Sequence, residues 1–228
     1  MIRFLRPGDP PDAFPPLEQA LDEPDGLLCA GGDLSPARLL EAYRRGIFPW
    51  YSVGQPILWW SPNPRAVLFP GEFRVSRSLA KTLRNRGCET RLDSAFAEVV
   101  VRCADTELRP EGTWISPDMQ SAYLELHRLG HAHSVETWQA GRLVGGLYGV
   151  ALGRVFFGES MFSIERDASK VALARLVEEA MARGIELIDC QVTSPHLESL
   201  GARSIPRARF SALLSAAIPH AGTHPAWD

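Results

Sequence analysis

The chain lacks long apolar runs and an excess of either charge. Its apolar stretches fall well short of the roughly 20 residues that span a bilayer, so the sequence predicts no membrane segment. The segment from Met1 to Pro7 stops being apolar too soon for a secretory signal. A net charge of −3 gives no overall indication of a nucleic-acid partner, which leaves the local distribution of charge to be considered.

Cysteine is scarce, and the spacing of the four cysteines excludes two common uses. They lie far apart at Cys29, Cys88, Cys103 and Cys190, and none belongs to a Cys-x-x-Cys motif. This pattern favours a reduced, cytoplasmic protein over a disulfide-stapled one. The pair His131 and His133 has no third ligand at a suitable spacing and suits the end of a helix. We therefore predict no metal.

Length and composition predict a globular protein with a substantial core. The chain has 228 residues, of which 45% are hydrophobic and 22% charged. This is enough for one large domain or two small ones. A proline-rich stretch at Pro62–Pro64 suggests a boundary between a small N-terminal α/β domain, residues 1–63, and a second domain, residues 64–228.

Aromatic residues gather just before this boundary. Trp50, Tyr51, Trp59 and Trp60 lie in a segment that prolines interrupt, so it cannot be a regular helix. Two interpretations remain open. The tryptophans form a small aromatic core, or some of them offer a stacking surface for a base.

A basic stripe follows. The segment from Ser76 to Gly87 is predicted to be helical, and Arg77, Lys81 and Arg84 lie on one side of it at i, i+4 and i+7. Such a stripe is either a solvated helix face or a track for phosphate groups. The sequence leaves both interpretations open.

The second half of the chain has the pattern of an α+β fold. A helix from Pro117 to Gly130 precedes three strands within residues 134–161, where the apolar period changes to two. Another helix ends at Gly184 and leads into a buried strand, residues 185–192. This order is typical of a GNAT-type acyltransferase, with a mixed, mostly antiparallel sheet flanked by helices. The glycines of the strands indicate a bulge or a close ligand approach.

The last of these strands carries two polar residues. Asp189 and Gln191 are two residues apart, so a regular strand places them on the same face. A buried polar pair needs partners, because leaving it unpaired costs about 1–3 kcal/mol. The pair is either a satisfied element of the core or a catalytic couple.

Several motifs together resemble the leucyl/phenylalanyl-tRNA–protein transferase family over residues 15–210. The likeness is carried by Gly-Gly-Asp-Leu-Ser-Pro (31–36), Gly-Ile-Phe-Pro-Trp (46–50), Trp-Trp-Ser-Pro (59–62), Val-Gly-Gly-Leu-Tyr-Gly-Val (144–150), Gly-Glu-Ser-Met-Phe-Ser (158–163) and Leu-Ile-Asp-Cys-Gln-Val (187–192). The resemblance implies transfer of Leu, Phe or Met from an aminoacyl-tRNA to proteins that begin with Arg or Lys. The product is a signal for the degradation machinery.

The resemblance also implies roles for single residues. Asp189 and Gln191 correspond to the family's catalytic relay and Glu159 to its active-site glutamate. Trp50 and Trp114 match the tryptophans that hold the terminal adenosine of the tRNA. The remaining matches fall in the family's pocket for the amino-acid side chain: Leu147, Phe156 and Met161.

The implied reaction is aminolysis of an activated ester, which needs neither ATP nor a metal, so we expect no cofactor. Our hypothesis is that the Gln191 amide donates to Asp189, and that its carbonyl oxygen then accepts a hydrogen from the attacking amine. The acceptor's basic side chain needs a carboxylate, for which Glu159 and Asp189 are both candidates. Arg77, Lys81 and Arg84 are the residues we expect at the tRNA backbone.

Two other functions were weighed. An acetyl-CoA-dependent acetyltransferase needs a glycine-rich cradle for pyrophosphate, but the turn at 162–167 has no glycine and carries two acids within Glu165–Asp167. A non-catalytic tRNA- or peptide-binding module explains the basic stripe and the tryptophans. It leaves Glu159, Asp189 and Gln191 without a role.

Overall fold

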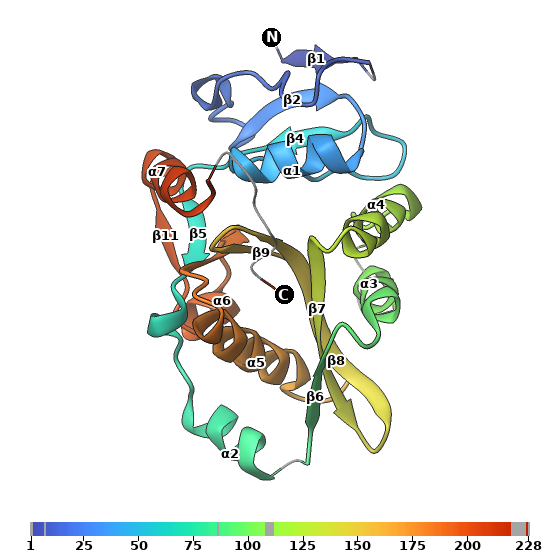
Figure 1. The fold of residues 1–228 in the computed structure, drawn as a ribbon, viewed down its shortest axis with the longest axis vertical. Coiled ribbons are helices and arrows are strands. Elements are labelled where there is room, and N and C mark those ends of the chain that lie inside the picture. The colour runs from blue at the N-terminus through green and yellow to red at the C-terminus, as the bar shows by residue number, and fades with distance from the viewer. Residues whose placement is uncertain (1, 7, 86, 108–111, 220–226, 228) are drawn as a thin grey trace.

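The structure is a computed structural model that describes residues 2–6, 8–85, 87–107, 112–219 and 227. Within these residues the strands form a four-stranded and a seven-stranded sheet, with helices packed around the larger one (Figure 1). No helix in this described part of the chain combines the length and apolar character needed to cross a membrane.

The elements follow one another along the chain with short connections. In order they are β1 (Arg3–Leu5), the 3-10 helix η1 (Leu17–Gln19), β2 (Leu27–Gly31), α1 (Pro36–Arg44), β3 (Phe48–Pro49), β4 (Leu58–Trp60), β5 (Arg65–Leu68), the 3-10 helix η2 (Pro70–Glu72), α2 (Arg77–Asn85), β6 (Glu89–Leu92), α3 (Phe96–Ala104), α4 (Pro117–Arg128), β7 (Ala132–Gln139), β8 (Arg142–Leu152), β9 (Val155–Ser163), α5 (Ala168–Ala182), β10 (Leu187–Gln191), α6 (Pro195–Ser199), β11 (Arg203–Ile205) and α7 (Arg207–Ala217).

The smaller sheet is built from the N-terminal residues, in the order β1-β2-β4-β3. The aromatic segment supplies its β3 and β4, since its prolines exclude a helix but allow short strands. Trp59 is fully buried, and its indole N–H donates to the Gly31 carbonyl at 2.8 Å. The core interpretation is therefore correct for Trp59.

The larger sheet has the order β11-β5-β10-β9-β8-β7-β6. Every neighbouring pair is antiparallel except β9 and β10, which run parallel. Helix α5 packs against one face, while α3 and α4 cover the other together with the N-terminal part (Figure 1). The prediction of an α+β fold with a mixed, mostly antiparallel sheet flanked by helices is confirmed.

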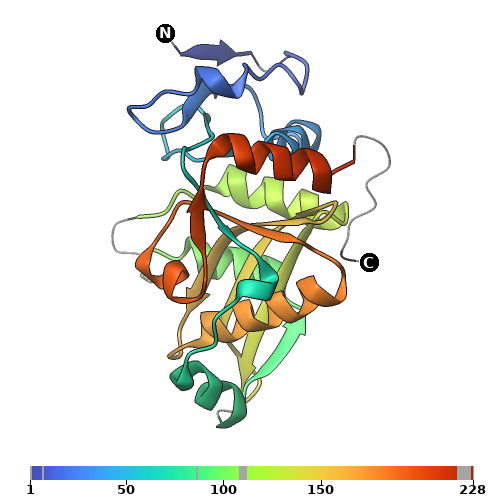
Figure 2. The same ribbon diagram turned by 90° about the vertical axis from the view of Figure 1, so that its left-hand side faces the viewer.

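The sequence does not predict every element, and β6 and α7 are two that it leaves out. Strand β6 pairs with β7 at the edge of the sheet, and its sequence Glu-Thr-Arg-Leu is too short and polar to show an apolar period. Helix α7 crosses the junction between the two sheets (Figure 2) and buries Phe210, Leu214 and Ala217. These residues follow a helical spacing within a segment that has no acidic residue or side-chain cap to mark its start.

One continuous apolar core joins the N-terminal part to the larger sheet. It includes Leu39 and Ile47 from the first 63 residues together with Val150 and Phe157 from β8 and β9. The two sheets divide the chain between β4 and β5, but the domain boundary at residues 63 and 64 stays a prediction.

Strands β9 and β10 part where the polar residues lie. Their parallel pairing runs from Val155 opposite Leu187 to Phe157 opposite Asp189 and ends there. Beyond this point the register of β10 against β5 shifts, and Gln191 takes a left-handed backbone with φ of 55°. The strand is therefore irregular at its end, and the alternation of a regular strand does not hold at Gln191. The parting of the strands leaves a gap in the sheet.

A glycine allows the neighbouring bulge. The register of β8 against β9 shifts between Tyr148 and Gly149. A Cβ atom at Gly149 would overlap the Phe157 carbonyl oxygen and the Phe156 ring. The register shift supports the predicted bulge at Gly149, and the alternative of a close ligand approach stays a prediction.

We predict that Gly149→Ala lowers the free energy of unfolding by about 1–3 kcal/mol or more, because the sheet must shift to make room. Urea unfolding measures the change. The control is Gly71→Ala, since Gly71 has an ordinary φ and no atom lies within 4 Å of a Cβ placed there. Equal stability of the two variants would contradict the close approach seen at Gly149.

Candidate active site

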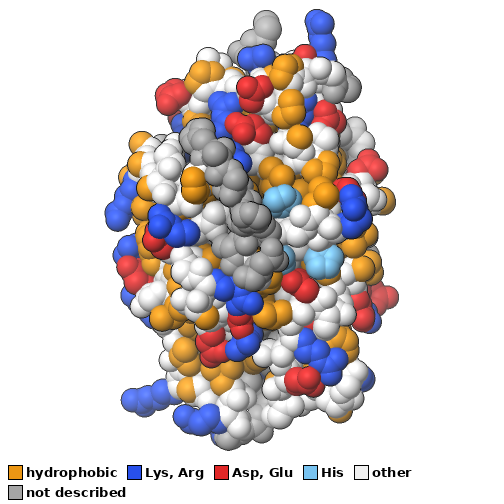
Figure 3. Space-filling view, viewed as in Figure 1, with side chains coloured by type: hydrophobic (Ala, Val, Ile, Leu, Met, Phe, Trp, Pro, Cys, Tyr) orange, Lys and Arg blue, Asp and Glu red, His pale blue; other side chains and the backbone are white. Residues whose placement is uncertain are grey.

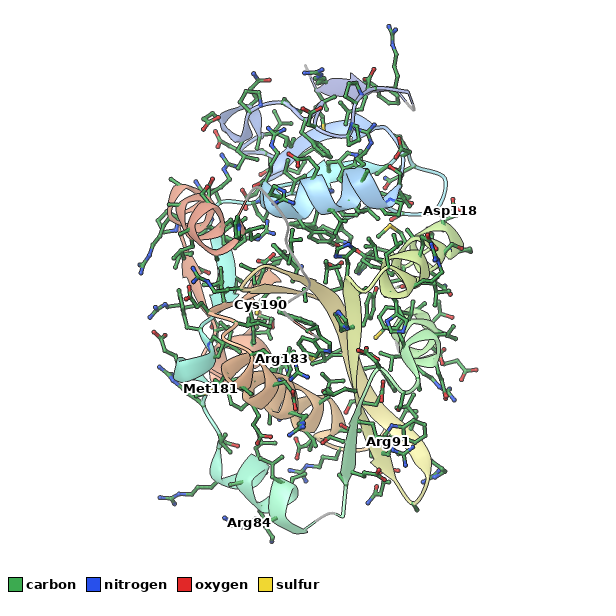
Figure 4. All side chains as sticks on the ribbon, in the orientation of Figure 1. Arg84, Arg91, Asp118, Met181, Arg183 and Cys190 are labelled. Atoms are coloured by element: carbon green, nitrogen blue, oxygen red, sulfur yellow. The ribbon has the colours of Figure 1, made fainter. Side chains whose placement is uncertain are left out.

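Two cavities meet in the gap between β9 and β10. One has a volume of about 360 Å³ and the other of about 310 Å³. Glu159, Cys190 and Gln191 line both. These three residues therefore form the border across which a molecule bound in one cavity meets a molecule bound in the other. Cys190 lies near the middle of the molecule in Figure 4.

The larger cavity is mostly apolar and lies on the α5 side of the sheet. Leu147 and Met161 line it, as the resemblance implied. The other apolar residues of its wall are Leu173, Leu176, Ile188 and Leu197. Phe156, the third residue expected here, is not part of the wall. It is fully buried, with its ring 5.4 Å from that of Trp227.

The smaller cavity is aromatic. Trp50 and Trp114 both line it, although they are far apart in the sequence. Trp50 is 45% exposed, so much of its ring is free to contact a ligand. The indole N–H of Trp60 donates to the Trp50 carbonyl at 2.6 Å, which fixes the backbone that carries Trp50.

Asp189 is held in a buried ion pair with Arg65. The Arg65 guanidinium donates from Nε to Oδ1 at 2.8 Å and from its terminal nitrogen to Oδ2 at 2.6 Å. The guanidinium is stacked between the rings of Phe48 and Phe210 and donates to the Gly46 carbonyl. Both charged side chains are almost completely buried. This bidentate geometry satisfies a charge pair that is costly to bury.

The structure corrects our hypothesis of a direct relay between Asp189 and Gln191. Asp189 Oδ1 accepts the backbone N–H of Gln191 at 3.1 Å, and the Gln191 side chain points elsewhere. The amide Nε2 donates to Glu159 at 3.3 Å instead. The left-handed backbone at Gln191 is the cause, because it turns the side chain away from the face that holds Asp189. Asp189 thus supports the main chain of Gln191.

Glu159 has the densest set of polar contacts in the gap. Besides the Gln191 amide, it accepts the Tyr43 hydroxyl at 2.8 Å on Oε1 and the Tyr123 hydroxyl at 2.6 Å on Oε2. Both tyrosines are fully buried, and α1 and α4 supply them from opposite sides. The carboxyl group of Glu159 is therefore fixed in place from three directions.

Burial changes the acidity of the groups at this border. Burial raises the pKa of the Glu159 carboxyl to about 7, against the lowering effect of the two tyrosine hydrogen bonds. Burial also raises the pKa of the Cys190 thiol to about 12, so this thiol stays protonated at neutral pH. A protonated thiol is a poor nucleophile, which argues against a covalent intermediate on Cys190.

The basic stripe lies far from the cavities. Helix α2, with Arg84, is at one end of the molecule, and Cys190 is near its middle (Figure 4). Arg77, Lys81 and Arg84 are all exposed. Within the described residues none of the three is in an ion pair. Basic side chains project into solvent at the lower end of Figure 3, where Figure 1 places α2.

His133 lies near more potential metal ligands than its spacing from His131 in the sequence suggested. His133 meets Asp93 at 2.8 Å, and His127 is close enough to form a group of three potential metal ligands with them. His131 is not part of this group. Nδ1 of His127 already lies 2.7 Å from the Ala132 carbonyl, and Nδ1 of His133 is the atom that meets Asp93. Hydrogen bonds therefore account for the cluster, and the absence of a metal stays a prediction.

Sequence reasoning missed three residues of the site. Tyr43 and Tyr123 lie at helical spacing among apolar residues, which predicts only packing, and Arg65 follows the proline-interrupted segment without a predicted role. Arg65 carried a usable signal, because an arginine that opens the apolar run Arg-Ala-Val-Leu needs a buried acid if the strand is internal. Nothing in the spacing of the tyrosines indicated that they meet the same carboxylate.

The fold and site define a class of protein. An apolar pocket and an aromatic cleft that share a carboxylate and an amide suit an enzyme that transfers an acyl group between two molecules. The likeness to solved structures is distant. One example is a GCN5-related N-acetyltransferase from Kribbella flavida, with a TM-score of 0.41 and 13% identity over 74% of this chain and 60% of that chain.

The chain belongs to the leucyl/phenylalanyl-tRNA protein transferase family. The family model matches residues 67–215, and the model of the family's N-terminal domain matches residues 32–63. A transferase of this name from Aromatoleum aromaticum is 63% identical over 202 residues, which are 89% of this chain and 85% of that protein. Another from Nitrosomonas europaea is 56% identical over 227 residues, covering 100% of this chain and 95% of that protein.

We predict that Arg65→Met lowers the free energy of unfolding by about 3–5 kcal/mol, because it leaves the Asp189 carboxylate buried without a partner. The double variant Arg65→Met, Asp189→Leu should lose less, since no charge is then left buried. Urea unfolding of both measures this. The control is Arg91→Met, whose pair with Glu89 is exposed to solvent and therefore adds little stability. A single variant as stable as this control would contradict the account of the ion pair.

Proposed function

We propose that the protein is an aminoacyltransferase that moves Leu, Phe or Met from an aminoacyl-tRNA to the N-terminal α-amine of proteins that begin with Arg or Lys. The product would then serve as an N-terminal degradation signal for the degradation machinery. The observation that carries this proposal is the meeting of an apolar cavity and a tryptophan-lined cavity at Glu159 and Gln191. Membership of the transferase family supports the same activity.

The donor fits the two cavities in one orientation. The apolar cavity of about 360 Å³, lined by Leu147 and Met161, suits an apolar side chain that is not branched at Cβ. Its wall carries little polar surface, so it discriminates weakly, since one methylene is worth about 1–3 kcal/mol. The terminal adenosine then lies against Trp50 and Trp114, and the ester carbonyl falls at the border between the cavities.

Chemistry at the border needs a neutral amine in the correct place. A free α-amine has a pKa near 8, so about a tenth of it is neutral at pH 7. Gln191 donates its amide to Glu159 and keeps its carbonyl oxygen available to accept a hydrogen bond from the attacking amine. As the tetrahedral intermediate collapses, the C–O bond to the ribose breaks and one amine proton passes to the departing ribose oxygen.

The acceptor's basic side chain is assigned to Glu159. Glu159 and Asp189 are the two acidic residues among the described residues that line the cavities. Asp189 is already neutralised by Arg65 and is fully buried, so it has no capacity for a second cation. Glu159 faces both cavities and has no cationic partner in the described structure.

The structure gives no support to acetyl-CoA as the donor. A pyrophosphate would bind at free backbone N–H groups at the start of α5. Here the N–H of Ala168 donates to the Glu165 carbonyl, and that of Ser169 to the Ser163 hydroxyl. A binding module without catalysis would leave the fixed Glu159 and Gln191 unexplained.

The decisive experiment is a transfer assay. Labelled Leu on tRNA is offered with peptides that begin with Arg, Lys or Ala, and a parallel reaction offers labelled acetyl-CoA. We expect label on the Arg and Lys peptides, little on the Ala peptide and none from acetyl-CoA. Binding without transfer would favour the non-catalytic module, and acetyl transfer would overturn the proposal.

We predict that Gln191→Ala lowers kcat/KM for transfer by about 10²-fold or more, because the amide no longer orients the amine. Gln191→Glu should be similarly impaired, since it places a second carboxyl group beside Glu159. Gln19→Ala, which removes an exposed glutamine on η1, serves as the matched control. Full activity in both Gln191 variants would remove this residue from the mechanism.

We also predict a role for α2 in holding the body of the tRNA. Replacing Arg77, Lys81 and Arg84 with Gln should raise KM for aminoacyl-tRNA. The slope of the logarithm of the tRNA binding constant against the logarithm of salt concentration should become shallower by about 0.7–0.9 for each phosphate contact that is lost. Transfer from a stemless 3′-aminoacyl-adenosine should not change, because that donor has no backbone to hold.

The control for this experiment removes the same charge elsewhere. Arg128, Arg142 and Arg154 are exposed and each is paired with a glutamate, so their replacement with Gln should leave KM for aminoacyl-tRNA nearly unchanged. An equal effect of the two triple variants would point to overall charge and would remove α2 as a specific contact.

A further inference from the structure

Four oxygen atoms from three side chains lie close together in the site: the hydroxyls of Tyr43 and Tyr123 and the two carboxyl oxygens of Glu159. Tyr43 Oη lies 2.8 Å from Glu159 Oε1, and Tyr123 Oη lies 2.6 Å from Oε2. The two phenol oxygens are themselves 2.7 Å apart. Together the three side chains form a closed ring, and each of its three oxygen–oxygen contacts is at hydrogen-bond distance.

The number of protons in this ring depends on the state of Glu159. Each tyrosine supplies one O–H, and an ionised carboxylate supplies none. Two protons cannot fill three contacts, and two phenol oxygens at 2.7 Å with no proton between them repel each other. A protonated Glu159 supplies the third proton. Its O–H then donates to Tyr43, Tyr43 donates to Tyr123, and Tyr123 donates to the other carboxyl oxygen.

We propose that Tyr43 and Tyr123 hold Glu159 as a neutral carboxylic acid in the free enzyme, and that the cationic first residue of the acceptor displaces this proton when it binds. The step is balanced: Glu159 loses H⁺ to solvent, and its carboxylate then pairs with the guanidinium or ammonium group. Tyr43 and Tyr123 are positioning residues that act through Glu159. This inference rests on the proposed function, and it adds a proton-linked mode of recognition.

The other groups near the ring do not supply a competing charge. Asp189 disfavours ionisation of Glu159, while Arg65, its own ion-pair partner, favours it, so the two act in opposite directions. Gln191 and the protonated Cys190 thiol are neutral, and the neighbouring Tyr148 of β8 is fully buried. Burial raises the pKa of Glu159 to about 7. Tyrosine hydroxyls that donate to the carboxylate lower this pKa, whereas in the closed ring Tyr43 accepts the proton of the carboxylic acid and so favours the neutral form.

Proton linkage explains how one carboxyl group tells Arg and Lys from uncharged residues. While Glu159 is neutral, an uncharged side chain gains nothing by approaching it. A cation favours the ionised form and gains a charge pair in a partly buried site, so the proton leaves. Binding of an Arg acceptor should therefore strengthen as the pH rises through 7, whereas binding of an uncharged analogue should not.

Calorimetric titration in buffers of different ionisation enthalpy tests the proposal. A peptide that begins with Arg should release about one proton at pH 6 and progressively fewer above pH 7, since a group with a pKa of about 7 is mostly protonated at pH 6. A matched peptide that begins with the uncharged isostere citrulline corrects for the α-amine, and Glu159→Gln should abolish the difference. Equal release by the two peptides on the native protein would overturn the proposal.

Replacing a tyrosine of the ring gives a second test, because the proton ring and a simple pair of hydrogen bonds to a carboxylate predict opposite shifts of the pH midpoint. Tyr43→Phe opens the ring. With Glu159 protonated, the variant loses two of the ring's hydrogen bonds. With Glu159 ionised, it loses only one hydrogen bond and is also relieved of the repulsion between the two phenol oxygens. The pH midpoint of proton release should fall. If the tyrosines merely donated to an ionised carboxylate, the midpoint would rise, and the ring would be disproved. Tyr51→Phe, a tyrosine outside the ring, is the control.

Infrared spectroscopy makes the test independent of acceptor binding. The free native protein should show the carbonyl band of a protonated carboxylic acid at pH 6, and Glu159→Gln or Tyr43→Phe should remove or shift it. Absence of this band from an active protein would overturn the proton ring but leave the proposed function intact. Failure of Arg peptides as substrates in the transfer assay would instead count against the proposed function.

Discussion

The site depends on the buried ion pair between Arg65 and Asp189. It joins β5 to β10 at the point where β10 leaves β9, and it fixes the Gln191 backbone through the Asp189 carboxylate. The rings of Phe48 and Phe210 enclose the guanidinium, so residues from the N-terminal part and from α7 meet at one charge. A pair of this kind adds little net stability but is costly to break. Its effect here is to fix the position of the Gln191 backbone relative to β5.

The gap beside this ion pair brings two cavities of different character together. On the α5 side is an apolar cavity, and on the other side is a cleft with Trp50 and Trp114. Glu159 and Gln191 border both, so an aminoacyl ester that spans the gap presents its carbonyl to an amide and a carboxyl group. Family membership gives the reaction. In our proposal Glu159 binds the acceptor's basic side chain, and Asp189 supports the backbone of Gln191.

The sequence was informative where a local pattern determines the structure. Periodicity of two and of 3.6 predicted the helices and strands between Pro117 and Gln191, and the family resemblance located Trp50, Trp114, Leu147 and Met161 at the cavities. It could not predict contacts between distant positions. Arg65 is 124 residues from Asp189, and the left-handed turn at Gln191 overrides the strand alternation that suggested a direct relay. Phe156 was misplaced because it faces Trp227 within the core rather than the cavity.

The most direct test of this account is a crystal structure with a non-hydrolysable donor, a 3′-amide-linked leucyl-adenosine. The account predicts the leucine side chain in the cavity beside Leu147 and Met161 and the adenine against Trp50 and Trp114. It also predicts the carbonyl next to Gln191, with Asp189 still paired to Arg65. A structure in which Asp189 turns from Arg65 to the Gln191 amide, or in which the carbonyl lies away from Glu159 and Gln191, would contradict it.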